Sequence, residues 1–139
     1  MRDDFFSGKW TGQYSYGADY SGIAPVPFEL DMTVLNGNVH GECRDDETKH
    51  HFDRPAIIEG ALQDNQITFI KKYPWFWDHD QDNKPRFFPK LPAREVRYTG
   101  RFENGKFTGE WIISSLYTDE SGQVLEYRGT GFWEMTKLV

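Results

Sequence analysis

Alternation of apolar and polar residues is the feature that most constrains the fold of this chain. In residues 28–34, FELDMTV, every second side chain is apolar, and Glu, Asp and Thr stand between them. A period of two places successive side chains on opposite faces, which is typical of a strand with one buried face. The same pattern recurs in further segments, at residues 10–16, 39–43, 58–62, 67–69, 96–102, 107–113 and 125–135. We therefore predict an all-β fold of eight strands.

Glycine recurs at positions that share the parity of the apolar residues. The unit aromatic-x-glycine-x-aromatic occurs as WTGQY at 10–14, YTGRF at 98–102 and FTGEW at 107–111. An inward glycine lets a strand bend sharply and leaves room for a neighbouring ring over its bare backbone. Such bends on several strands are needed to close a curved sheet into a small barrel. We expect a barrel, with a twisted sandwich that contains glycine bulges as the alternative.

The lengths of the connections predict how the strands are ordered. Three connections carry residue pairs suited to tight hairpins, Asn36-Gly37, Asp64-Asn65 and Asn104-Gly105. The others are longer and cover roughly residues 17–26, 45–55, 74–93 and 115–123. In an up-and-down meander, successive connections fall at alternate ends. The sequence therefore predicts one domain over residues 1–139, an eight-stranded up-and-down antiparallel β-barrel with tight turns at one end and long loops at the other.

Charge and composition exclude several classes of partner. The chain has 139 residues, 17% of them aromatic, and a formal net charge of -6 without a cluster of Lys or Arg. We therefore expect neither nucleic acid nor an anionic membrane as a partner. No apolar run reaches the length of a signal peptide or a membrane span. Cys43 is the one cysteine, which excludes an internal disulfide, and we expect a cytoplasmic protein.

The first strand opens with a motif that known small barrels share. Gly8-Lys9-Trp10-Thr11-Gly12 is similar to the glycine-x-tryptophan opening of lipocalins. With this motif and its loop pattern, the chain resembles the calycin group of lipocalin, fatty-acid-binding and avidin-type barrels. The resemblance implies a ligand-binding cup whose floor is plugged by the tryptophan ring.

The chain also departs from this group in two places. Trp10 lies too close to the N-terminus for the N-terminal helix that lipocalins have. The Arg-x-Tyr pair with which fatty-acid-binding barrels hold carboxylates is replaced by Tyr127-Arg128-Gly129. Residues 98–109 resemble a MORN repeat instead, but such repeats stack in arrays and a single clear copy favours a shared hairpin pattern.

Inward-facing residues near the long-loop end are the candidates for contact with a ligand. By position and parity they are Tyr14, Tyr16, Asp45, Lys71, Tyr73, Trp75, Trp77, Arg94 and Tyr127. Lys71 shares the parity of Ile67 and Phe69, so on an apolar face it must reach the rim, pair with Asp45 or contact a ligand. Lys71 and Arg94 suit an amphiphilic molecule with its apolar body in the cup and an anionic group on the cations.

Two patterns resemble metal sites without completing one. Residues 78–82, DHDQD, have the spacing of the first half of a calcium loop, but Asn83 stands at the usual glycine and the twelfth position is a proline. His50-His51 on one long loop, with His79 on the next, form the zinc alternative. We predict neither a metal nor a cofactor.

Binding of a small hydrophobic or amphiphilic molecule in the barrel mouth is the function that we predict. The chain has no glycine-x-serine-x-glycine elbow, the motif of a serine nucleophile. A small barrel enzyme with acid/base residues on the mouth loops is one alternative, but the sequence does not indicate which reaction it would catalyse. A second alternative is a protein-interaction or homodimer surface formed by aromatic residues 74–88. We expect residues 74–93 to extend the flanking strands as a hairpin over the mouth, with Trp75 and Trp77 toward the cavity and Phe76 away from it.

Overall fold

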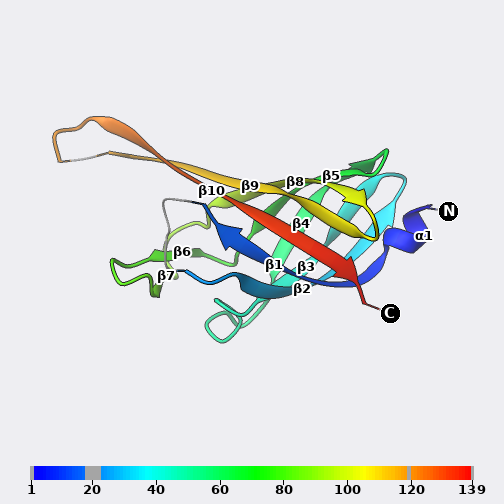
Figure 1. Cartoon of the computed structure of the whole chain (residues 1–139). Coiled ribbons are helices and arrows are strands. Elements are labelled where there is room, and N and C mark those ends of the chain that lie inside the picture. The colour runs from blue at the N-terminus through cyan, green and yellow to red at the C-terminus, as the bar shows by residue number, and fades with distance from the viewer. Residues whose placement is uncertain (1, 18–22, 119, 139) are drawn as a thin grey trace.

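The computed structural model describes residues 2–17, 23–118 and 120–138 of the chain. The barrel strands are β1 Gly8–Tyr16, β2 Val26–Leu35, β3 Asn38–Asp45, β4 Ala56–Gln63, β5 Gln66–Lys72, β8 Glu95–Glu103, β9 Lys106–Thr118 and β10 Val124–Lys137. Within the described ranges they form a closed antiparallel barrel in the order β1-β10-β9-β8-β5-β4-β3-β2 (Figure 1). The predicted all-β, eight-stranded up-and-down barrel is confirmed. That residues 1–139 form one domain stays a prediction.

Strand β2 shows why these residues form a barrel wall. Phe28, Leu30 and Met32 are buried inside the barrel, whereas Glu29 and Asp31 between them are exposed. Because alternate residues of each strand point inward, the apolar set of every strand meets in one core.

The three tight turns are confirmed and close one end of the barrel. Their central residues all have positive φ, 53° and 78° at Asn36-Gly37, 53° and 66° at Asp64-Asn65, and 54° and 84° at Asn104-Gly105. Two successive positive φ angles define a turn whose twist matches that of the flanking strands. The third turn joins β8 to β9, so the MORN-like residues 98–109 are a hairpin of this barrel. The long connections lie at the opposite end, which we call the mouth (Figure 1).

Two inward glycines show why the sheet needs bare backbone. A Cβ atom at Gly131 would lie 2.4 Å from the ring of Trp111, so this ring packs directly on the glycine backbone. A Cβ atom at Gly109 would lie 1.8 Å from the carbonyl oxygen of Thr99 on the neighbouring strand. Both distances are far below van der Waals contact, which explains the glycines that the sequence places among aromatic residues.

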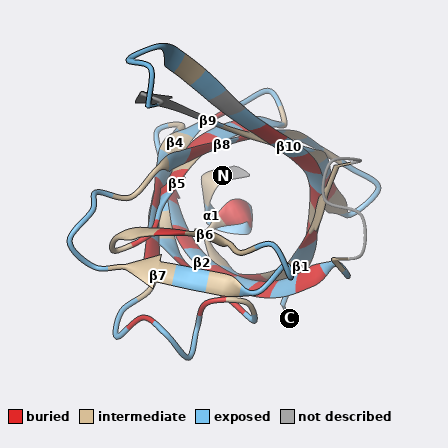
Figure 2. Cartoon of the chain, turned by 90° about the vertical axis from the view of Figure 1, so that its left-hand side faces the viewer, coloured by how far each residue is buried: buried red, intermediate tan, exposed pale blue. Residues whose placement is uncertain are grey.

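A short helix covers the tight-turn end, and the expectation that no N-terminal helix exists is wrong. Helix α1 spans Arg2–Phe6 and carries two acidic residues in its first turn, where they interact favourably with the helix dipole. The indole Nε1 of Trp10 donates to the carbonyl oxygen of Phe6 at 2.9 Å, and Trp10 is completely buried. Figure 2 looks into the barrel from the mouth and shows α1 at its far end. In the described ranges, no helix has the length and apolarity of a membrane span.

The mouth carries a second, smaller sheet. β6 Phe76–His79 and β7 Pro85–Phe88 pair with each other, and in the described part of the chain they join no barrel strand. We call residues 76–88 the mouth hairpin. The hairpin is therefore confirmed, but the expectation that it continues the flanking barrel strands is wrong, because β5 and β8 already end as partners at Lys72 and Glu95.

The last connection is shorter than the sequence analysis expected. Residues 115–123 were expected to form a long loop, but β9 and β10 remain paired as far as Thr118 and Val124. β8 accompanies β9 only as far as Ile113. The end of the β9–β10 hairpin therefore projects beyond the barrel wall (Figure 1).

Substitution of Gly109 by Ala tests the role of the bare backbone. We expect Gly109→Ala to lower the free energy of unfolding by about 3 kcal/mol, because the added methyl group meets the backbone of Thr99 and the strand must shift. Urea unfolding measures this change. Thr108→Ala, one residue away on the exposed face, is the matched control and should stay within about 0.5 kcal/mol of the parent. Equal effects of the two substitutions would contradict the packing argument.

Candidate functional site

A cavity of about 60 Å³ opens at the mouth, between the barrel wall and the mouth hairpin. Its lining is mostly aromatic and consists of Tyr14, Tyr16, Lys71, Tyr73, Trp75, Trp77, His79, Arg94, Val96, Tyr98, Trp111 and Ile113. All the predicted site residues except Asp45 and Tyr127 are among them. Asp45 pairs with Lys71 at 4.0 Å, and the side chain of Tyr127 lies outside the described residues. Ligand contact by these residues stays a prediction.

Lys71 is held inside the barrel by charge and by aromatic rings. Its Nζ donates to the hydroxyl oxygen of Tyr98 at 2.9 Å and lies 4.0 Å from Oδ2 of Asp45. The same nitrogen lies 4.7 Å, 4.8 Å and 5.0 Å from the ring centroids of Tyr14, Tyr73 and Tyr98. Only 2% of Lys71 is exposed, so it pairs with Asp45 and does not reach the rim.

The protonation state of Lys71 follows from this environment. Burial alone would lower the pKa of its ammonium group, but the neighbouring Tyr98, Cys43 and Asp45 outweigh burial and leave this pKa above its ordinary value. Lys71 therefore carries a charge at neutral pH, which excludes it as a neutral amine nucleophile. The ion pair with Asp45 makes this part of the site close to neutral.

Asp45 connects the barrel wall to the loop of residues 46–55. Its Oδ1 accepts hydrogen bonds from the backbone nitrogen and the hydroxyl of Thr48 at 2.8 Å and 2.9 Å. Its Oδ2 accepts the hydroxyl of Tyr73 at 2.7 Å. Because both carboxylate oxygens have donors, Asp45 satisfies the requirement that a buried charge be paired and hydrogen-bonded.

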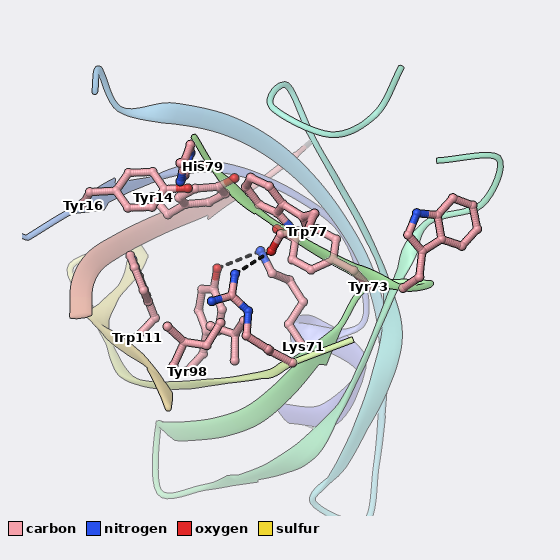
Figure 3. A pocket seen from close by; sticks show the side chains of 12 residues that line it. Tyr14, Tyr16, Lys71, Tyr73, Trp77, His79, Tyr98 and Trp111 are labelled. Carbon is pink, nitrogen blue, oxygen red and sulfur yellow. Dashed lines mark hydrogen bonds between the residues drawn. The ribbon is translucent and has the colours of Figure 1, made fainter. Parts of the chain in front are cut away.

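Glu47 is a functional candidate that the sequence analysis missed. Its Oε1 accepts the hydroxyls of Tyr14 and Tyr16 at 2.9 Å and 2.5 Å, and its Oε2 lies 2.6 Å from Nε2 of His79. Burial alone would raise the pKa of Glu47, but the hydrogen bonds from His79 and the two tyrosines outweigh burial and lower it. Glu47 is therefore ionised at neutral pH and joins three segments of the mouth. Figure 3 shows Tyr14, Tyr16 and His79 together on one side of the cavity, with Lys71 reaching toward Tyr98.

The sequence contained a signal for some missed residues but not for others. Tyr98 and Trp111 lie on strands whose inward parity was recognised, so their place in the core was predictable, although their contact with the cavity was not. Glu47 lies on a loop, where alternation gives no direction to a side chain, whereas His79 lies on β6 with the parity of Trp75 and Trp77. The parity of His79 therefore carried a signal, although the sequence analysis names His79 only for the zinc alternative.

The mouth hairpin is fixed by aromatic contacts to the loop of residues 46–55. The ring of His51 stacks on Phe87 at 4.4 Å, and Phe52 packs against Phe87 and Trp75 at 5.2 Å and 5.0 Å. Trp77 is buried beside the cavity. These contacts hold the mouth hairpin against the loop of residues 46–55.

Residues 75–77, where the chain enters the mouth hairpin, alternate in direction. Trp75 and Trp77 line the cavity, whereas Phe76 packs on Phe88 at 5.6 Å and is absent from the cavity lining. Arg94 lies over the ring of Phe76 at 4.7 Å and donates to the carbonyl oxygen of Trp77. Arg94 therefore links the start of β8 to the hairpin.

Asp78 and Asp80, which suggested a calcium site, have other partners. Asp80 accepts the backbone nitrogens of Asp82 and Lys84, and Asp78 forms a two-point hydrogen bond with Arg86 across the hairpin. Among the described residues, no three His, Cys, Asp or Glu side chains converge on a common point. The calcium and zinc alternatives therefore gain no support from the arrangement of these side chains.

Substitution of Lys71 by Met tests whether the buried ion pair is coupled. We expect Lys71→Met to lower the free energy of unfolding by about 3–5 kcal/mol, because Asp45 would be left buried without a compensating charge. The double variant Lys71→Met/Asp45→Asn should lose less than the sum of the two single losses, because it buries no lone charge. Urea unfolding of the three variants measures both effects. Strictly additive losses would contradict the coupling.

Comparisons with known proteins support the fold. No family model and no curated protein matches this chain. Rhizavidin is similar over 100% of this chain and 91% of its own, with 12% identity and a TM-score of 0.50. A rhizavidin–biotin complex is similar over 96% of each chain, with 14% identity and a TM-score of 0.51. A bradavidin2–biotin complex is similar over 95% of this chain and 96% of its own, with 15% identity and a TM-score of 0.48. The predicted resemblance to avidin-type barrels is thus confirmed as a resemblance of fold.

Proposed function

We propose that the protein binds a small hydrophobic or amphiphilic molecule in the mouth of the barrel. The observation that carries this proposal is the buried Lys71–Asp45 pair beside an aromatic cavity. A buried ion pair rarely stabilises a fold more than apolar residues of similar volume would. A buried ion pair beside a cavity is therefore better explained by binding of a ligand than by stabilisation of the fold. Ligand sites combine apolar walls with a few fixed polar groups.

An unsatisfied donor on a residue that lines the cavity supports the same proposal. Nε1 of Trp75 is buried and has no hydrogen-bond partner among the described residues, and Trp75 lines the cavity. A buried donor without an acceptor destabilises a fold by about 1–3 kcal/mol. A ligand with an oxygen or nitrogen acceptor would remove this penalty.

Ligand entry requires that the mouth hairpin move. A cavity of about 60 Å³ is well below the roughly 300–1,000 Å³ of typical ligand pockets. The hairpin forms its own sheet, so it can swing outward without breaking a hydrogen bond of the barrel ladder. The removal of Trp77 and His79 from the mouth would then enlarge the cavity toward solvent.

A structural neighbour offers a precedent for this use of the fold. The solved complex of rhizavidin contains biotin, which is a small molecule. At 14% identity the likeness concerns the fold, so biotin enters here only as one probe of the mouth. The cytoplasmic location, the homodimer through residues 74–88 and the enzyme alternative stay predictions.

A panel of four probes tests the proposed function. The panel is 2-phenylethanol, 3-phenylpropionate, phenethylamine and biotin, measured by isothermal titration calorimetry and by native mass spectrometry of freshly purified protein. We expect at least one probe, or a co-purified small molecule, to bind with one-to-one stoichiometry. Trp111→Leu should weaken this binding about tenfold, because it removes an aromatic wall of the cavity.

The control for this experiment lies on the outer face of the barrel. Phe132 is 59% exposed and does not line the cavity, so Phe132→Leu should leave the affinity unchanged. Absence of binding by all four probes, together with a clean mass for the purified protein, would contradict the proposed function. Equal weakening by Trp111→Leu and Phe132→Leu would contradict the location of the site.

A further inference from the structure

The imidazole of His79 occupies the mouth in the manner of a bound ligand. Its Nε2 lies 2.6 Å from Oε2 of Glu47, and its ring meets Tyr16 and Trp77 edge-to-face at 5.1 Å each. The side chain is only 9% exposed. His79 belongs to the mouth hairpin, which in the described part of the chain joins no barrel strand. One polar side chain of a segment that lies outside the barrel sheet is thus inserted into the site.

The groups that receive His79 are held independently of the hairpin. Glu47 lies between Asp45 and Thr48, whose hydrogen bonds fix this stretch of chain to the barrel. Tyr14 and Tyr16 on β1 donate to Oε1 of Glu47, so Oε2 faces the hairpin. If the hairpin moves away, this oxygen loses its donor from His79, and a carboxylate oxygen in a poorly hydrated site needs a replacement.

We propose that His79 is an internal stand-in for the ligand, and that the open mouth recognises a small aromatic amine whose protonated nitrogen binds Glu47 in its place. This inference rests on the proposed function and adds the chemical class of the ligand to it. The ligand's ring would lie against the wall that Tyr16 and Trp111 form at a centroid distance of 5.4 Å.

The charges of the site favour a cation over an anion. Lys71 already has Asp45 at 4.0 Å and the Tyr98 hydroxyl at 2.9 Å, so it offers little net attraction to a carboxylate. Arg94 also lines the cavity, but its guanidinium donates to the carbonyl oxygen of Trp77 and lies over the ring of Phe76. Glu47 with its surrounding tyrosine rings presents a carboxylate and electron-rich faces, which is a combination that binds ammonium and imidazolium groups.

If His79 occupies the ligand's place, the His79 side chain and the ligand compete for Glu47. A ligand that requires the open hairpin binds with an apparent affinity reduced by the fraction of molecules that are open. Removal of the His79 side chain raises that fraction and should therefore tighten amine binding. Removal of the Glu47 charge should weaken it, because the ligand's nitrogen would lose its charged acceptor.

Three probes of matched size test the inference by isothermal titration calorimetry at neutral pH. They are phenethylamine, which is a cation, 3-phenylpropionate, which is an anion, and 2-phenylethanol, which is neutral. We expect phenethylamine to bind at least about tenfold more tightly than the other two. His79→Ala should tighten phenethylamine binding about tenfold, and Glu47→Gln should remove the preference for the amine.

Two controls separate these effects from changes in net charge. Asp46→Asn removes a neighbouring exposed carboxylate, which pairs with Lys49, and should leave the preference for the amine unchanged. His50→Ala removes an exposed histidine of the same loop and should leave the affinity unchanged. Near-ultraviolet circular dichroism checks that each variant keeps its aromatic packing.

A measurement on the unaltered protein keeps the inference testable if Glu47→Gln fails to fold. In nuclear magnetic resonance spectra, saturating phenethylamine should move the imidazole signals of His79 and leave those of His40 on the exposed face of β3 unchanged. Tight binding of 2-phenylethanol or 3-phenylpropionate without preference for the amine would overturn this inference while the proposed function stands. Absence of binding by all probes in the parent and in His79→Ala would overturn both.

Discussion

The carboxylate of Asp45 is the interaction on which the arrangement of the mouth depends. One of its oxygens fixes Thr48 and with it the loop of residues 46–55, and the other accepts the hydroxyl of Tyr73 at the end of β5. The same carboxylate balances the charge of Lys71. Loss of this carboxylate would release the loop of residues 46–55, and with it Glu47, which holds the mouth hairpin through His79. It would also release Tyr73 and Lys71.

The barrel and the mouth hairpin are stabilised by different kinds of interaction. The barrel depends on a continuous backbone ladder and a core in which Trp10, Ile58 and Phe107 have no exposed surface. The hairpin depends on ring contacts, the Arg94 bond to its backbone and the pairing of Glu47 with His79. Two-stranded sheets are marginally stable by themselves in water. The hairpin is therefore the part of the mouth that can open at low cost while the wall stays intact.

Alternation and turn chemistry made the fold predictable from the sequence. Parity assigned the inward residues of each strand, and the two-residue turns at Asn36-Gly37, Asp64-Asn65 and Asn104-Gly105 fixed which connections share an end. Because both rules are local, they also located Tyr14 and Lys71 of the candidate site correctly.

The remainder depends on contacts between residues far apart in the sequence. Helix α1 has five residues, which is too short to show a helical period, and its place follows from the burial of Phe6 under the barrel floor. The position of Glu47 follows from the fold of a loop, and its partner His79 is 32 residues away. Parity alone identified Lys71 as an inward-facing cation. That Lys71 pairs with Asp45 and does not extend to the rim could be predicted only from the relative positions of β3 and β5.

Native-state hydrogen exchange at the mouth hairpin tests the central claim most directly. The account predicts that amides of β6 and β7 exchange through a local opening with a much smaller free energy than the amides of β5 and β8. It further predicts that this opening leaves the exchange of the barrel strands unchanged. If the hairpin amides exchange only through global unfolding, with the same free energy as the barrel, the mouth does not open separately and the account of ligand entry is wrong.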